Sequence, residues 1–248
     1  LEKSVRDLEL QSFNTDLLAT KLTELEFHAL VNQLISFSQE DAVPEYDSPK
    51  KNYQTIRTID ALEKAVQIME KAELISFDIE TTSLQAMETD IVGLSFSIAP
   101  NEGWYIPILF KDKSENLFGK DDLKIVLDAC RNILENEDII LTGQNIKFDA
   151  LVMKNHDVHL AGIAFDSLLA AHLVNPVSRS YKLETLSLEL LNYPMLPIED
   201  LIGKGRKQIT MAEVALEKTA FYAAEDADVT GQITSILQKK LKEEELYS

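Results

Sequence analysis

Residues 74–80 read LISFDIE, a strand pattern in which apolar and polar side chains alternate. The three apolar residues point to one face of such a strand, and Ser76, Asp78 and Glu80 point to the other. Asp and Glu are poor strand residues, and two carboxylates two positions apart on one face repel each other. A half-solvated strand with a polar outer face explains this pattern, because D-x-E alone is a weak motif. A site that requires paired carboxylates is the alternative.

Strands and helices alternate along the sequence around this segment. Further strands are expected at residues 53–59, 91–98, 104–110, 139–141 and 159–165, and helices at residues 60–72, 121–134, 146–155, up to 174 and at 218–245. Residues 99–103 (APNEG) predict a hairpin turn between two of the strands. Pro107 lacks an N–H donor, so its strand should lie at or near a sheet edge. The order predicts an α/β fold with a mixed β-sheet covered by helices.

The first 52 residues differ in composition from the rest of the chain. Residues 15–37 carry leucines at the spacing of an amphipathic helix, which is too short to bury its own apolar stripe. A polar, acidic stretch with Pro44 and Pro49 follows, and it has the composition of a linker. We therefore expect a domain boundary at residues 38–52. Because the chain starts at Leu1 and not at Met, we expect it to be an excised piece.

The chain is acidic, with 24 Lys and Arg against 42 Asp and Glu in 248 residues, a formal charge of −18. Such a charge argues against tight binding to phosphate, because nucleic acids are held mainly by Lys and Arg. Residues 1–200 carry 17 − 34 = −17, whereas residues 201–248 carry 7 − 8 = −1 and repel a polyanion least. The single Cys130 excludes an internal disulfide and indicates a reducing, cytoplasmic location. No apolar run approaches the ~20 residues of a membrane span.

Two more segments carry carboxylates at informative positions. In LTGQNIKFD (residues 141–149), Asn145 and Asp149 are four residues apart and share a helix face, although Asn145 also fits an N-cap. In FYAAEDAD (residues 221–228), Tyr222 and Asp226 are spaced in the same way and are flanked by alanines. The neighbouring acids of this helix, residues 225 and 228, are interpreted as a solvated face.

The three segments together supply four carboxylates and one phenol: Asp78, Glu80, Asp149, Asp226 and Tyr222. Carboxylates that cluster without a cationic partner repel each other unless divalent cations bind between them. Oxygen ligands favour hard ions such as Mg²⁺ or Mn²⁺ over zinc. Two such ions about 3.5–4 Å apart are the usual arrangement for in-line attack at phosphorus. The carboxylates therefore predict a two-metal nuclease site.

The three motifs, D-I-E at 78–80, N-x-x-x-D at 145–149 and Y-x-x-x-D at 222–226, resemble those of the DEDD exonuclease superfamily, tyrosine subclass. Over residues 53–245, words such as FDIETTSL, IVGLSFSIAP, GQNIKFD and YAAEDADVT are similar to the 3′→5′ proofreading domains of bacterial family A DNA polymerases. This resemblance implies a ribonuclease H-like fold. It also implies that residues 1–37 are the end of a 5′-nuclease domain, and that a polymerase domain of the same polypeptide follows.

The resemblance further assigns roles to the site residues. Asp78, Glu80 and Asp226 would hold one metal ion, and Asp78 would bridge to a second that Asp149 supports. Tyr222, with an ordinary pKa of about 10, would orient the attacking water rather than act as a base. The products would be 5′-mononucleotides released from a 3′ end. All four carboxylates and the tyrosine are present, so we expect an active enzyme.

The same resemblance suggests contacts with a single-stranded DNA 3′ end. Leu84 would wedge against the terminal base, with ordinary packing as an equal alternative, and Gln144 and Asn145 would lie near the terminal nucleotide. The densest basic patch would contact the DNA backbone, unless it is simply a solvated loop: Lys204, Arg206 and Lys207. We expect a monomer. Two other functions stay open: an RNA-trimming exonuclease resembling ribonuclease D, and an inactive spacer that binds DNA.

Overall fold

The computed structural model describes residues 15–24, 50–110, 117–118 and 121–246. The chain divides into two units, residues 1–49 and residues 50–248, and each is described by itself. In the first unit, α1 (Thr15–Glu24) forms the beginning of the expected helix, whose remainder, residues 25–37, lies outside the described residues. The assignment of residues 1–37 to a nuclease domain and of 38–52 to a linker stays a prediction.

The second unit is built on one mixed sheet of six strands, ordered β1-β4-β3-β2-β5-β6. The strands are β1 (Asn52–Thr55), β2 (Leu74–Thr81), β3 (Ile91–Ser97), β4 (Glu102–Pro107), β5 (Ile140–Gly143) and β6 (Ile163–Asp166). The central strand β2 pairs antiparallel with β3 and parallel with β5. The expected hairpin joins β3 to β4, and Asn101 takes the positive φ of 66° that its turn requires. The prediction of a mixed α/β fold is confirmed.

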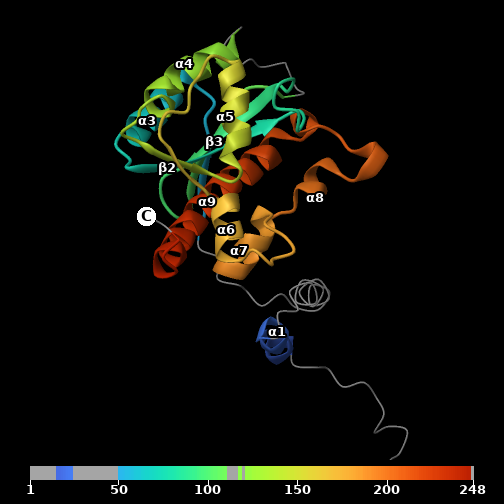
Figure 1. Ribbon diagram of the computed structural model, residues 1–248. Helices are drawn as coiled ribbons and strands as arrows, with labels where there is room; N and C mark the ends of the chain where they lie inside the picture. The colour runs from blue at the N-terminus through green and yellow to red at the C-terminus, as the bar shows by residue number, and fades with distance from the viewer. Residues whose placement is uncertain (1–14, 25–49, 111–116, 119–120, 247–248) are drawn as a thin grey trace, which may run out of the picture. The chain divides into compact units, whose positions relative to one another are not determined.

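Helices cover both faces of this sheet. They are α3 (Ile59–Met69), α4 (Asp122–Leu134), α5 (Ile146–Asn155), α6 (Ser167–Val174), α7 (Leu183–Leu191), α8 (Ile198–Ile202) and α9 (Leu216–Glu243). The apolar residues of β2 share one core with α3, α4 and α5. The long helix α9 packs along β1 to β5 and then against α6 and α7 (Figure 1). The alternation of side chains along β2 therefore separates an apolar face of the sheet from the face that contacts α9.

Small residues let α9 approach the sheet closely. A Cβ added at Gly103 of β4 would lie 3.0 Å from the Ala224 carbonyl oxygen, and one at Gly231 of α9 would lie 3.3 Å from the Ser76 Cβ. Alanines at positions 223, 224 and 227 of α9 are completely buried. This narrow spacing allows short side chains such as Asp to meet across the interface.

Several boundaries differ from the sequence predictions for local reasons. The helix α3 begins at Ile59, one residue before the expected start, because Thr58 caps it: the Thr58 side-chain oxygen accepts from the Ala61 amide. Pro107 ends β4, the strand next to the edge strand β1, and it lies beyond the residues that pair with β1. The missing amide donor is therefore tolerated one strand inside the edge. Within the described residues, no helix has the length and apolarity needed to cross a membrane.

Candidate active site

Three carboxylates meet between β2 and α9. Asp78 and Glu80 project from β2 toward α9, and Asp226 comes from the middle of that helix. One oxygen of each of the three lies within 4.8 Å of one of the others. Glu80 is buried, and the other two are half-buried. The structure thus brings together residues that are almost 150 positions apart in the sequence.

Asp149 adds a fourth carboxylate from the first turn of α5 and is 3% exposed. Burial raises its pKa well above the usual range, and the negative charge of Asp78 raises it further. The Ile79 amide acts in the opposite direction and lowers the pKa of both Asp78 and Asp149. Asp149 therefore adjoins the three-carboxylate cluster, on the side of Asp78.

Tyr222 lies one helical turn before Asp226 on α9 and is 7% exposed. Its ring packs among apolar residues that include Val92, Met211 and Val214. Burial, followed by the charges of Asp226 and the β2 carboxylates, raises the pKa of its hydroxyl above the ordinary value of 10. The hydroxyl beside Asp226 also lowers the pKa of that carboxyl, the effect of a hydrogen-bond donor. Tyr222 is thus held as a proton-bearing donor at neutral pH.

The four carboxylates repel one another, and a bound cation would relieve this repulsion. Burial raises the pKa of Asp78 to about 6, and it raises those of Glu80 and Asp226 well above their usual values. Among the described residues, no ion pair joins any of the four to a Lys or Arg. A buried carboxylate without a counter-charge is costly, and a divalent cation removes that cost. The all-oxygen donor set fits a hard cation such as Mg²⁺ or Mn²⁺.

The loop after β2 presents Leu84 to solvent, with 92% of its surface exposed. The loop itself is ordered by hydroxyl groups. Thr89 accepts from the Ser83 amide at 2.9 Å, Thr82 accepts from the Asp90 amide at 3.1 Å, and Asn155 of α5 donates to the Ala86 carbonyl. An apolar side chain this exposed does not fit ordinary packing. Its role as a wedge stays a prediction.

Gln144 and Asn145 lie where β5 leads into α5. The Gln144 amide nitrogen donates to the Tyr181 carbonyl at 2.8 Å, and its oxygen accepts from the Ser167 hydroxyl. Asn145 takes a left-handed conformation, φ 60°, and makes no side-chain capping bond to α5. Its backbone N–H donates to a carboxylate oxygen of Asp166 at 3.1 Å. The side chain of Asn145 is therefore exposed, whereas the amide group of Gln144 is already hydrogen-bonded.

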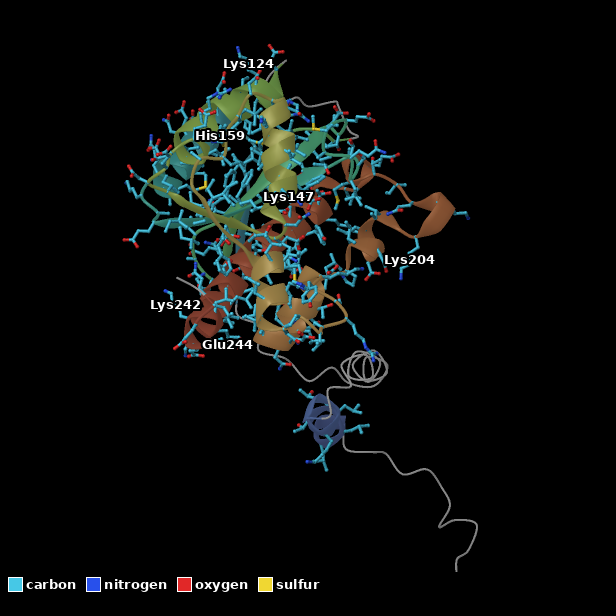
Figure 2. The ribbon with its side chains drawn as sticks, viewed as in Figure 1. Lys124, Lys147, His159, Lys204, Lys242 and Glu244 are labelled. Atoms are coloured by element: carbon cyan, nitrogen blue, oxygen red, sulfur yellow. The ribbon has the colours of Figure 1, made fainter. Side chains whose placement is uncertain are left out.

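The basic loop follows α8, away from α5. Figure 2 shows Lys204 on this loop and Lys147 at the start of α5. Lys204 and Lys207 are exposed, and the Lys204 Nζ lies 2.5 Å from a carboxylate oxygen of Glu199. The backbone of Arg206 forms part of a short 3₁₀ turn, Gly205–Lys207, and its side chain lies outside the described residues. The structure does not bring this loop into the carboxylate cluster.

The interpretation of Glu225 and Asp228 as a solvated face of α9 is wrong. Both are 1% exposed. Asp228 accepts bonds from Lys51 and Tyr53, which precede it by about 175 residues. Because these partners are so distant in the sequence, no local pattern could have revealed them. The sequence shows only that the two acids, three residues apart, share a helix face, and this holds for a solvated face as well.

Most of the chain is similar in sequence to known proteins. A profile described as 3'-5' exonuclease matches residues 53–242. DNA polymerase I of Pseudomonas aeruginosa is 32% identical over 227 residues, 88% of this chain and 24% of that protein. DNA polymerase I of Chloroflexus aurantiacus is 34% identical over 213 residues, 85% of this chain and 22% of that protein. The chain thus spans about a quarter of the length of these relatives.

Two solved structures share the fold. Escherichia coli RNase D, an exoribonuclease involved in structured RNA processing, matches with a TM-score of 0.59 at 17% identity, over 77% of this chain and 46% of that one. The POL domain of Pol1 from M. smegmatis, in complex with DNA primer-template and dNTP, matches with a TM-score of 0.56 at 16% identity, over 76% of this chain and 27% of that one. These likenesses show a common fold.

Proposed function

Since the chain belongs to the 3'-5' exonuclease family, we propose that it hydrolyses the terminal phosphodiester bond at the 3′ end of single-stranded or frayed DNA and releases 5′-mononucleotides. One observation carries this proposal: oxygens of Asp78, Glu80 and Asp226 lie within 4.8 Å of one another. Asp149 adjoins them, and within the described part of the chain no Lys or Arg neutralises them. Divalent cations would relieve the repulsion within such a cluster.

Divalent metal use follows from the family and the acidic cluster together. We propose two ions, Mg²⁺ or Mn²⁺, with Asp78, Glu80 and Asp226 holding one, and Asp78 and Asp149 supporting the other. When bound, such ions lower the pKa of an attacking water and stabilise the charge on a leaving oxygen. The four side chains would supply the negative charge for this purpose; Glu80 and Asp149 are buried, and Asp78 and Asp226 are half-buried.

Tyr222 is proposed to orient the water that attacks the terminal phosphorus. Its pKa is raised above 10 by burial and by the surrounding carboxylates, so the hydroxyl keeps its proton at pH 7–8. A protonated phenol can donate a hydrogen bond but cannot take up a proton as a general base. Tyr222 would therefore position the attacking water. Tyr222→Phe should lower the turnover rate more than it lowers the affinity for metal.

We propose that the DNA end is held by a small number of contacts close to the carboxylates. The exposed Leu84 would lie against the terminal base, and the exposed Asn145 would lie beside the terminal nucleotide. Gln144 would reach a nucleotide only by exchanging its bonds to Tyr181 and Ser167. The basic loop of Lys204, Arg206 and Lys207 would contact the backbone of the incoming strand, which favours weak and salt-dependent binding.

In its natural setting the chain is proposed to be the proofreading part of a bacterial DNA polymerase I. Residues 1–37 would be the end of a 5′-nuclease domain, residues 38–52 a linker, and a polymerase domain would follow in the same polypeptide. The similarity to relatives about four times longer supports this arrangement. We propose that the isolated chain is a monomer, and that the parent protein works in the cytoplasm beside the nucleoid.

An RNA-trimming exonuclease is the second candidate, favoured by the shared fold with E. coli RNase D. Matched 5′-labelled DNA and RNA oligonucleotides of one sequence separate the two, because they differ in the 2′-hydroxyl and, at uracil, a methyl group. With Mg²⁺ we expect the DNA to shorten faster and to yield 5′-mononucleotides. Faster degradation of the RNA would establish the second candidate. No degradation of either by a metal-loaded chain would identify an inactive DNA-binding spacer.

A further inference from the structure

A second group of polar side chains, buried or half-buried, is centred on two acids of α9 that lie about 100° and 200° around the helix from Asp226. It consists of Asp228 and Glu225 of α9, Lys51 and Tyr53 at the edge strand β1, and Tyr193 in the loop after α7; we call it the Asp228 cluster. None of these residues belongs to the proposed metal site. Both carboxylates are 1% exposed, which is rare for acidic residues that are not bound by partners.

Both oxygens of Asp228 are fully used. One accepts from the Lys51 ammonium at 2.9 Å and from the Tyr53 hydroxyl at 2.7 Å. The other accepts from the Asn101 amide at 2.8 Å and from the Gln232 side chain at 2.7 Å. These donors come from β1, from the β3–β4 turn and from α9 itself. One carboxylate therefore ties the helix to two separate parts of the sheet.

Glu225 fastens the same side of α9 to the loop between α7 and α8. It accepts from the Tyr193 hydroxyl at 2.6 Å and from the Leu196 amide at 3.1 Å. The Lys51 ammonium lies 4.4 Å from the centre of the Tyr193 ring, which links the two halves of the cluster. Three segments of the chain thus hold one face of α9 through bonds to charged groups, which are stronger than bonds between neutral groups.

The rotation of α9 decides where Asp226 lies. Side-chain atoms on a helix lie about 5–6 Å from its axis, so a rotation of only about 10° moves them by about 1 Å. Protein ligands to a metal ion hold their distances to within about 0.2 Å, and Mg²⁺ demands nearly ideal octahedral geometry. The small residues between α9 and the sheet set the distance between them. The bonds of the Asp228 cluster connect α9 to the start of β1, to the β3–β4 turn and to the loop after α7.

We propose that Asp228, with Lys51, Tyr53 and Glu225, positions Asp226 and Tyr222 for metal binding and catalysis by fixing the rotation of α9. Asp228 is a positioning residue that touches neither metal nor substrate. The inference rests on the proposed function because it takes the acidic cluster to be a metal site. It adds that the metal affinity of the carboxylates depends on the hydrogen bonds that Asp228 forms on the other side of α9.

The test compares Asp228→Asn with Thr234→Val. Asparagine keeps the size of Asp228 but turns one acceptor into a donor, which faces existing donors whichever way the amide is oriented. Thr234 lies six residues after Asp228 on α9 and is buried, and its hydroxyl shares a hydrogen bond of 2.7 Å with the hydroxyl of Thr142. Its isosteric replacement by valine removes one buried bond without touching the Asp228 cluster. Tyr53→Phe and Lys51→Met remove single donors from Asp228.

Metal affinity is measured first without DNA, in a titration with Mn²⁺ that is monitored by electron paramagnetic resonance. It is measured again as the Mg²⁺ concentration that gives half-maximal cleavage of DNA. We expect both to weaken by about 10-fold or more in Asp228→Asn, the effect of removing outer-shell partners of metal ligands. Tyr53→Phe and Lys51→Met should weaken both by about threefold. Thr234→Val should stay within twofold of the original chain, although its melting temperature falls.

Wild-type metal affinity in a folded Asp228→Asn variant would overturn the inference. If that variant does not fold, Lys51→Met and Tyr53→Phe decide in the same way. An equal loss of affinity in Thr234→Val would also overturn it, because general destabilisation would then explain the effect. A wild-type chain that binds Mn²⁺ but cleaves no DNA refutes the proposed function alone. A wild-type chain that binds no Mn²⁺ refutes both.

Discussion

At the scale of single residues, the site depends on carboxylates whose pKa values are raised by burial. In the absence of metal, Asp78 has a pKa of about 6, and Glu80, Asp149 and Asp226 also hold their protons more tightly than exposed acids. The folded chain thus carries protons that the unfolded chain has lost between about pH 4 and pH 6 or above. Stability therefore falls as the pH rises through that window.

This shift predicts the effect of pH on the metal-free protein. With chelator present, the melting temperature should be lower at pH 8 than at pH 5, and Asp78→Asn should reduce the difference by roughly 5 °C. The size follows from the free energy that the raised pKa of Asp78 costs between pH 5 and pH 8. For a chain of this length, 1 kcal/mol corresponds to a change of about 2–4 °C in melting temperature. The same pH dependence in both proteins, followed by circular dichroism, would show that the pKa of Asp78 is not raised.

Leu84 carries a second prediction at this scale. Because 92% of its surface is exposed, Leu84→Ala should leave the melting temperature unchanged. If the side chain lies against a terminal base, the variant should lose about 1.4 kcal/mol of binding and raise KM for single-stranded DNA about tenfold. Ile68 on α3, which covers the face of the sheet opposite to α9, is 48% exposed, so Ile68→Ala is the control and should keep its KM. Unchanged kinetics for Leu84→Ala would remove Leu84 from the DNA site.

At the scale of elements, the strands were more predictable than their surroundings. The alternation of residues 74–80 predicted β2 and the side on which Asp78 and Glu80 lie, and α5 was predicted with its bounds. Local periodicity carries this information because it depends on residues two to four positions apart. The hydrogen-bond partners of Asp228, Glu225 and Gln144 come from distant segments of the chain. Local periodicity therefore could not predict that the two acids are buried or that the Gln144 side chain is hydrogen-bonded.

Close packing of β3 on β4 predicts a sensitive glycine. A Cβ at Gly93 would lie 2.3 Å from the hydroxyl oxygen of Tyr105, a fully buried side chain. Gly93→Ala should therefore lower the free energy of unfolding by roughly 1–3 kcal/mol, as overpacking does. Gly231→Ala is the contrast, since its Cβ would meet Ser76 at 3.3 Å and α9 gains helix propensity. Urea titration that ranks Gly231→Ala as the more harmful change would contradict this packing.

At the scale of the whole molecule, the charge of −18 would limit how the proposed DNA substrate is bound, but it does not exclude such binding. Four of the negative charges are the proposed metal ligands, and −18 + 4 leaves −14. An acidic surface of this kind favours short, weak and metal-dependent contact with a DNA end. The basic loop near Lys204 belongs to the almost neutral last quarter of the chain, where a strand is repelled least.

Metal binding should also stabilise the folded chain as a whole. At Mg²⁺ concentrations of about 100 times Kd, linkage adds about 2.7 kcal/mol, which corresponds to a rise of roughly 5–10 °C in Tm. The rise should vanish in Asp78→Asn, because that residue is common to both proposed ion positions. A similar rise in that variant, measured by calorimetry at the same ionic strength, would place the ion elsewhere.

The most direct test of the account is the fate of a 5′-labelled single-stranded DNA oligonucleotide incubated with this chain. With Mg²⁺ we predict a ladder of products that shorten from the 3′ end, no ladder with excess chelator, and a loss of more than about 100-fold in rate for Asp78→Ala. A label released at once as a mononucleotide would indicate attack from the 5′ end. A ladder that persists in chelator or in Asp78→Ala would contradict the assignment of the carboxylates as the metal-dependent catalytic centre.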